Sequence, residues 1–451
     1  MTQTVDVEWL SHQIDDASVK GITLTASSLI RDGQIAVGMQ MPAVRELAER
    51  LGVSPATVSA AWAQLKKQKV LAGKGRSGVW VCGNSVLPRP IRFEKIGNYG
   101  ENIRAALAMA SPDPALLPDL KRAILAGIAS PELNSYQREA ISPQLQAAIS
   151  PRWPYPAEAW LATDGGFDAM NLIVQTLLSP GDRVVIENPT ATRLLDMLEN
   201  IGAEILPLPC DDQGPIPTAL ATHLQKSPAM FIYQPRTHSA TGYSVTQRRS
   251  AELARVLANS NTMIVEDDGI GDLSRWPAWS LGFHFPERVI HVHSFSKAYG
   301  PDLRLAALSA TADMVKRLQS WRNFGVSWTS RILQDAVAWM LTDEATQQSI
   351  QQAKTVYAQR RQQLLAALAK RGLVLEERDG LSVQIPVESE QYAMITLAAR
   401  GIAVLPGERC CLNGEPFIRV SASLLSFDQL ESIADALVIA SGRELKASPD
   451  L

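Results

Sequence analysis

Lys297 is the residue of this sequence whose surroundings best suit covalent chemistry. It stands in the stretch HVHSFSKAYGPDLRLA, residues 291–306, behind an apolar run and among small residues. Ser294 and Ser296 precede it, and Arg304 follows seven positions later. A primary amine in a partly desolvated pocket loses its proton more easily than in water and can form a Schiff base with an aldehyde. The stretch therefore predicts an amine that attacks a carbonyl, with donors for an anion close by.

Pyridoxal 5′-phosphate (PLP) is the common aldehyde cofactor for such a lysine, and it needs two further kinds of group. An acid must face its ring nitrogen, and Asp267, at the end of the apolar run TMIVEDD, can supply one. Its phosphate needs donors, which the serines and the arginine can provide together with the backbone N–H groups of a helix start at Gly165, Gly166 and Phe167. A lone lysine behind a strand is usually only solvated, so the prediction depends on the elements around it.

Short apolar runs and helical patterns alternate after about residue 112. Such alternation predicts a doubly wound α/β fold with a mainly parallel sheet and with ligand chemistry at the carboxyl ends of the strands. Lys297 follows one of these runs, which places it at the mouth of the sheet. The predicted strands are 159–164, 183–187, 203–209, 229–235, 262–268 and 288–294, and the clearest helices are 167–178 and 191–202.

Residues 42–67 have the spacing of a helix–turn–helix. Pro42 suits the start of a first helix, whose apolar residues recur at helical spacing up to Leu51, and Gly52 permits a tight turn. Ser54 is a good cap for a second helix that begins at Pro55, and such a helix can enter the major groove of DNA by its N-terminal end.

The stretch GKGRSGVWV, residues 73–81, matches the glycine spacing of a dinucleotide-binding loop but stands in the wrong context. That loop must follow a strand and open a helix, whereas this stretch follows a helix and leads into a short apolar strand. It is better interpreted as a β-hairpin wing with Lys74 and Arg76 at its tip, placed for DNA contacts. The alternative is an ordinary small helical domain with a solvated basic face.

Basic residues are concentrated at this end of the chain. The segment 31–81 has eight Lys or Arg against three Asp or Glu, a net charge of +5, while the whole chain carries −3, so the remainder carries −8. An acidic body with one basic end is expected of a regulator with a separate DNA-binding module.

Length and composition indicate a soluble protein of two or more domains. The chain has 451 residues, of which 46% are hydrophobic and 20% charged. It has no apolar run of the roughly 18 residues that a membrane span requires and no secretory signal pattern. Its four cysteines are scattered, which predicts reduced thiols in a cytoplasmic protein and neither a metal site nor a disulfide frame.

The N-terminal pattern resembles the winged helix–turn–helix of GntR-type bacterial regulators. The matching pieces are PAVRELAERLGVSPATVSAAW and the wing that ends VWV. The family often has an arginine after the serine of the recognition helix, where this chain has Pro55, so one contact is expected to differ. The resemblance implies DNA contacts at Arg45, Ser54, Thr57, Lys74, Arg76 and Gly78.

The chain from about 108 to 440 resembles fold-type I aminotransferases. T-D-G-G, E-N-P-T, T-G-Y, E-D-D, S-x-S-K and a late Arg419 occur in the expected order. With the winged module, the chain is similar to the MocR subfamily of GntR regulators, whose aminotransferase-like domain binds PLP and an effector. The resemblance implies that Lys297 forms the Schiff base, Asp267 faces the ring nitrogen and Arg419 binds an effector carboxylate. It also implies cofactor contacts at Gly165, Gly166, Phe167, Ser294, Ser296 and Arg304, and at Tyr136, which reaches the phosphate across a homodimer.

Three positions depart from the aminotransferase pattern. Ala191 replaces the aromatic residue that stacks on the cofactor ring. The tyrosine that usually follows the E-D-D segment and bonds the ring hydroxyl is absent, and the segment offers only Gly269 and Ile270. Ser239 takes the place of an asparagine and is kept as a cofactor contact. The residues expected to bind the phosphate and to form the Schiff base are present, whereas three residues that contact the cofactor ring are missing. We therefore expect no catalytic residues and slow or absent turnover, with a residual transamination half-reaction still open.

Three functions remain open from the sequence. The first is a transcriptional regulator that senses PLP or a PLP–amine adduct, binds an operator in double-stranded DNA and acts as a homodimer. The second is an aminotransferase with a helical N-terminal extension, and the third is a regulator whose large domain has lost the cofactor and only dimerises. The expected divisions are a DNA-binding domain over 1–82, a linker over 83–107 and an effector and dimerisation domain over 108–451.

Overall fold

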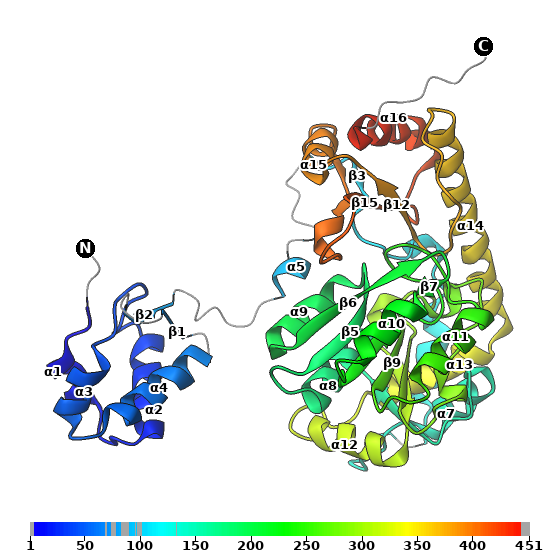
Figure 1. The fold of residues 1–451 in the computed structure, drawn as a ribbon. Coiled ribbons are helices and arrows are strands. Elements are labelled where there is room, and N and C mark those ends of the chain that lie inside the picture. Colours follow the sequence, from blue (N-terminus) through cyan, green and yellow to red (C-terminus); the bar gives the residue numbers. More distant parts are fainter. Residues whose placement is uncertain are drawn as a thin grey trace. The chain divides into compact units, whose positions relative to one another are not determined.

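Two compact units make up the chain in the computed structural model (Figure 1). The first unit covers Met1–Arg89 and the second covers Pro90–Leu451. Each unit has a hydrophobic core of its own. The structure describes residues 4–67, 70–73, 78–82, 90–94, 96, 102–131 and 133–442.

The first unit has the predicted helix–turn–helix. Helices α1 (Val7–Gln13) and α2 (Val19–Arg31) precede α3 (Val44–Leu51) and α4 (Pro55–Lys67). Gly52 ends α3 with a φ of 65°, in the left-handed region that favours glycine. The Ser54 hydroxyl accepts a hydrogen bond from the backbone N–H of Thr57 at 3.2 Å, which fixes the start of α4.

The predicted wing follows α4. Strands β1 (Leu71–Ala72) and β2 (Trp80–Val81) pair in antiparallel register. Lys74 and Arg76, expected at the tip of the wing, lie outside the described residues. The core beneath the helices and the wing is apolar and includes Leu10, Ile22, Leu47, Trp62 and Val81.

An eight-stranded sheet forms the centre of the second unit, and the predicted mainly parallel arrangement is confirmed. Its order is β4-β11-β10-β9-β8-β5-β6-β7, and β10, β9, β8, β5 and β6 run parallel to one another. Strands β11 and β7 are antiparallel to their neighbours within this sheet. The strands are β4 (Ala159–Thr163), β5 (Arg183–Asn188), β6 (Glu204–Asp211), β7 (Gly214–Pro215), β8 (Met230–Tyr233), β9 (Met263–Asp268), β10 (Val289–Ser294) and β11 (Ala306–Ala310).

Helices cover both faces of this sheet, because alternate strand residues point to opposite sides. Val184 and Ile186 of β5 pack in one cluster with α8 (Gly166–Leu177), α9 (Thr192–Ile201) and α12 (Ala312–Arg322). Val185, between them, packs in another cluster with α10 (Pro217–Leu224) and α11 (Gln247–Leu257). Among the described helices, none is long and apolar enough to cross a membrane.

Two further groups of elements complete the second unit (Figure 1). Helices α6 (Leu120–Ile128), α7 (Pro143–Ile149) and α13 (Arg331–Thr342) pack together, and the long α14 (Glu344–Ala369) follows α13. A smaller sheet has the order β12-β15-β14 and carries α15 and α16. The bounds are β12 (Ser382–Pro386), β14 (Leu405–Pro406), β15 (Phe417–Ser421), α15 (Glu390–Ala398) and α16 (Leu430–Ser441).

The described part of the predicted linker contains two elements of the second unit. Helix α5 (Ile91–Glu94) packs on α9, and β3 (Ala105–Ala106) pairs in parallel with β13 (Ile402–Ala403). The sequence of this segment shows no periodicity because both elements are too short to repeat an apolar pattern.

Gly127 sets the close approach of α6 to α13, because a Cβ there would lie 2.2 Å from the Ile332 carbonyl oxygen. We expect Gly127→Ala to lower the free energy of unfolding of the second unit by about 1–3 kcal/mol, the usual cost of overpacking. Denaturant unfolding followed by tryptophan fluorescence measures it. Gly325→Ala is the matched control, since its added Cβ would have no atom nearer than 3.8 Å. Equal midpoints for the two variants would contradict the packing described.

Candidate cofactor site and DNA interface

The predicted site residues gather where β9 and β10 end and α8 begins. Strands β9 and β10 are parallel neighbours, with Asp267 opposite Val292 and Asp268 opposite His293. Parallel strands present their carboxyl ends at one edge of the sheet, so the segment that carries Lys297 leaves the sheet beside Asp267. The first turn of α8 lies against the same edge, because a Cβ added at Gly166 would lie 3.2 Å from the Ser294 Cβ atom.

Lys297 has an enclosed amine with a neutral partner. Its Nζ donates a hydrogen bond to the backbone oxygen of Ala110, and no carboxylate of the described residues forms an ion pair with it. Burial lowers the pKa of the amine from 10.5 to about 8, and the guanidinium groups of Arg419 and Arg193 act in the same direction. A minor but appreciable fraction of this amine is therefore neutral and nucleophilic near neutral pH, whereas an ordinary lysine is almost fully protonated there.

Asp267 is held by a residue that the sequence did not indicate. Its Oδ2 accepts a hydrogen bond at 3.0 Å from Nε2 of Gln234, which follows β8. The backbone N–H of Ser239 donates to Oε1 of the same glutamine at 2.7 Å, so Gln234 joins Asp267 to the loop of the replaced asparagine. Burial raises the pKa of Asp267 to about 6, with a further rise from Asp268, while Gln234 opposes the shift.

A cradle of glycines and hydroxyls surrounds the start of α8. Gly165 has a φ of 105°, and a Cβ on it would lie 3.0 Å from Nη2 of Arg304. The same nitrogen of Arg304 donates a hydrogen bond to the backbone oxygen of Asp164 at 3.0 Å. This bond holds the guanidinium beside the start of the helix. The Ser294 hydroxyl accepts a long hydrogen bond of 3.4 Å from the backbone N–H of Ser296. Backbone donors at a helix start and a guanidinium together suit a phosphate.

Arg193 belongs to this cradle, although sequence reasoning missed it. It lies on α9, two residues after Ala191, with its guanidinium carbon 4.8 Å from the ring centroid of Phe167. Burial and the charge of Arg304 lower its pKa, and its Nε is buried without a partner among the described residues. The sequence signal that could have identified Arg193 is its position two residues after Ala191, the replaced aromatic.

Arg419 brings a further positive charge to the amine. It extends from β15, and its Nη2 donates to the Ala108 oxygen at 2.9 Å, two residues before the oxygen that binds Lys297. Its charge lowers the pKa of Lys297, as that of Arg193 also does. Lys297, Arg193, Arg304 and Arg419 thus form a cationic cluster whose mutual repulsion a bound anion would relieve.

The departures from the aminotransferase pattern can be followed in the structure. Ile270 is 2% exposed and packs in an apolar cluster, so its side chain offers no polar group in place of the missing tyrosine. His238, beside Ser239, accepts from the backbone N–H of Thr241 at 3.2 Å and stacks on Tyr243. Burial lowers its pKa to about 3, so it is a neutral residue that supports its own loop.

Tyr136 is not brought to the cradle by its own chain. It is 87% exposed, and its ring meets that of Trp328 edge-on at 5.9 Å. Its predicted contact across a homodimer stays a prediction.

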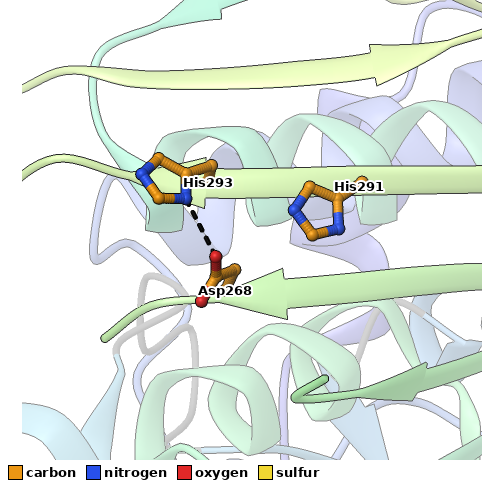
Figure 2. Close-up of side chains that lie close together, drawn as sticks. All are labelled: Asp268, His291 and His293. Carbon is orange, nitrogen blue, oxygen red and sulfur yellow. Dashed lines mark hydrogen bonds and ion pairs between the residues drawn. The ribbon is translucent and has the colours of Figure 1, made fainter. Parts of the chain in front are cut away.

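Asp268, His291 and His293 form a buried cluster beside the site (Figure 2). The nitrogen Nδ1 of His293 lies 2.8 Å from Oδ2 of Asp268, and Nη2 of Arg236 lies 2.9 Å from the same oxygen. Burial disfavours charge on His293, but Asp272 and Asp268 outweigh it and raise its pKa to about 9. His291 instead contacts Glu266 at 2.6 Å. The charged groups of Arg236 and His293 already neutralise the carboxylate of Asp268. The cluster is therefore better described as an ion-pair network than as a metal centre.

The DNA-facing candidates lie on the first unit. Arg45 is exposed on α3, and Ser54 and Thr57 stand at the start of α4 with their hydroxyl oxygens 2.9 Å apart. Gly78 precedes β2 and has a φ of 82°, in the left-handed region that favours glycine. A Cβ on it would also lie 2.2 Å from Nε2 of Gln40, whose flexible side chain would have to shift.

The fold and the site define a regulator of two parts, a winged helix–turn–helix unit for DNA and an aminotransferase-like unit. Residues 26–81 match bacterial regulatory proteins of the gntR family, and residues 107–437 match aminotransferase class I and II. The chain belongs to the GntR regulators of the MocR type, as the sequence predicted.

Its relatives include several HTH-type transcriptional regulators. The chain is 31% identical over 402 residues to the vitamin B6 salvage pathway transcriptional repressor PtsJ of Salmonella typhimurium, covering 87% of this chain and 91% of that protein. It is 25% identical to the pyridoxine biosynthesis transcriptional regulator PdxR of Corynebacterium glutamicum, covering 83% and 85%. The structure of the α-aminoadipate aminotransferase LysN of Thermus thermophilus matches with a TM-score of 0.68 at 22% identity, covering 78% of this chain and 94% of that one, which shows the fold.

The lowered pKa of Lys297 predicts an amine that reacts at unusually low pH. Labelling with acetic anhydride, read by peptide mass spectrometry, should show reactivity at position 297 that rises with a midpoint at about pH 8. The reason is that only the neutral amine reacts, and burial with two neighbouring guanidiniums disfavours the ammonium. Exposed Lys316 is the internal reference. A midpoint at the ordinary 10.5 would mean that the amine is hydrated and unperturbed.

Proposed function

We propose that this chain is a DNA-binding transcriptional regulator that senses PLP, or an adduct of PLP with an amine, through Lys297. The observation that carries the proposal is the placement of one enclosed amine beside a cationic cradle at the start of α8. Support also comes from two relatives whose names refer to vitamin B6 and pyridoxine.

The residues present fit the cofactor that the family implies. PLP supplies an aldehyde that condenses with a primary amine, and a phosphate dianion. Lys297 would provide the amine in its neutral form, and the cradle around Gly165, Ser294 and Arg304 would hold the phosphate. Asp267 would face the ring nitrogen, since its second oxygen is not the one that Gln234 occupies.

The ring-side groups of the site favour sensing over turnover. Ala191 and Ile270 can neither stack on a cofactor ring nor bond its hydroxyl. A loosely oriented ring is poorly aligned for the proton transfers of transamination, because small misplacements of reacting groups cost large factors in rate. The chain is therefore proposed to be no enzyme, with at most a residual half-reaction.

Lys297→Ala tests the role of the amine. Wild-type protein titrated with PLP should develop a visible absorption band of bound cofactor, and Lys297→Ala should lose it because no amine is left to condense. Lys316→Ala, which removes an exposed lysine of α12, should keep the band.

The same preparations separate the alternatives. If neither wild type nor variant shows a band, the result supports the third alternative, in which the large unit has lost the cofactor and only dimerises. If wild type converts amino acids to keto acids faster than about 1 s⁻¹, an ordinary enzyme rate, the chain is an aminotransferase with a DNA-binding extension.

The first unit is proposed to bind an operator in double-stranded DNA, and two copies in a homodimer would read two half-sites. A protein that acts on DNA in a bacterium would do so in the cytoplasm. Exposed Arg45 on α3 and the hydroxyls at the start of α4 carry the proposed contacts.

Arg45→Ala should weaken binding to DNA of any sequence and make it less salt-dependent. Each phosphate contact contributes about 0.9 to the slope of log K against log salt, so the slope should become shallower by about that amount for each copy bound. Fluorescence anisotropy with a labelled duplex at several salt concentrations measures it. Arg50→Ala is the control, since Arg50 lies on the same helix but pairs with Glu8 at 2.8 Å. An unchanged slope for Arg45→Ala would remove this residue from the interface.

A further inference from the structure

Helix α5 is fastened to α9 at two points. The carboxylate of Asp196 accepts the backbone N–H groups of Arg92 at 3.2 Å and of Phe93 at 3.1 Å. The guanidinium of Arg92 also pairs with Glu199, with Nη2 and Oε1 2.6 Å apart. Helix α5 begins at Ile91, directly after the division between the two units at 89 and 90.

A third contact joins α5 to the cofactor cradle. The guanidinium carbon of Arg193 lies 3.5 Å from the ring centroid of Phe93 and 4.8 Å from that of Phe167. Arg193 precedes Asp196 by three residues on α9, so it extends from the same helix face that binds α5. One guanidinium thus contacts the segment that follows the junction and the first turn of the phosphate-binding helix.

The contact with Phe93 is weak compared with what an anion would offer. The positive charge of Arg304 repels that of Arg193. The Nε atom of Arg193 is buried and has no hydrogen-bond partner among the described residues. Hydrogen bonds between a guanidinium and a phosphate or carboxylate are charge-assisted and can be bidentate, whereas a ring face offers only its quadrupole. An anion in the cradle would therefore compete successfully for this guanidinium.

We propose that Arg193 is a latch shared between the linker helix and the ligand. Without an anion, Arg193 holds Phe93 and so helps to keep α5 on α9. An anionic group bound at the start of α8 draws the guanidinium away and loosens α5, which changes the segment that leads to the DNA-binding unit. The identity of the anion as PLP rests on the function proposed above, but the latch itself requires only an anion in the cradle.

Hydrogen–deuterium exchange of the full-length protein tests the latch. The amides of Arg92 and Phe93 are bonded to Asp196, so a peptide covering 90–96 should exchange slowly without ligand. Inorganic phosphate at millimolar concentration, and PLP at lower concentration, should each speed this exchange severalfold. In Arg193→Gln, exchange should be fast from the start and should no longer respond to either anion.

Phe93→Leu separates a latch from simple packing, because it keeps apolar volume and removes the aromatic face. It should bind phosphate and PLP about two- to tenfold more tightly than wild type, since the competitor for Arg193 is gone. Phe285→Leu is the matched control, because Arg288 lies 4.1 Å over that ring in a similar pair. This control should leave both affinities unchanged.

The outcomes distinguish the latch from the proposed function. If PLP binds through Lys297 but neither the exchange of 90–96 nor the affinity of Phe93→Leu differs, the latch is wrong and PLP sensing stands. If phosphate produces both changes but no PLP band forms, the latch stands and PLP is the wrong ligand. If neither anion binds, the latch and the proposed function both fail.

Discussion

The site depends on the mutual repulsion of positive charges gathered around one amine. Burial, Arg419 and Arg193 disfavour the ammonium form of Lys297, and Arg304 in turn disfavours the charge on Arg193. Among the described residues, the amine of Lys297 contacts a carbonyl and no carboxylate. Folding therefore leaves a cationic cradle whose repulsion a bound dianion would relieve, and it leaves the amine partly neutral, which is the condition for condensing with an aldehyde.

The ends of the parallel strands and the glycines of α8 bring these groups together. Parallel β9 and β10 end at one edge, and the glycines at the start of α8 allow Ser294 and Arg304 to approach the helix backbone. On the ring side the same scaffold has Ile270 in an apolar cluster and His238 neutral in its loop. The residues proposed to hold an anion and an amine are present, while Ala191 and Ile270 stand where the aminotransferase pattern has residues that orient a ring. This division is the basis for the proposal that the protein detects a cofactor and does not turn over substrates with it.

The winged unit, the mainly parallel sheet and the group around Lys297 could be predicted from the sequence, because each has a local signature. Capping residues and apolar periodicity mark helices and strands, and Ser294, Ser296 and Lys297 are close neighbours in the chain. Gln234 and Arg193 were missed because their roles arise from contacts with residues distant in sequence. Helix α5 was missed because four residues are too few to show a period. Lys74 and Arg76 lie outside the described residues. The contact of Tyr136 with the phosphate of a partner subunit stays a prediction.

Sensing means that cofactor and operator must influence each other through one protein, and this influence is reciprocal at equilibrium. The most direct measurement is the dissociation constant of PLP with and without saturating operator DNA, the operator being mapped beforehand by footprinting. The account predicts that operator changes the affinity for PLP, and that PLP changes the affinity for operator by the same factor. Equal PLP affinities in the two conditions would contradict it, because the aminotransferase-like unit would then bind its ligand without any effect on DNA.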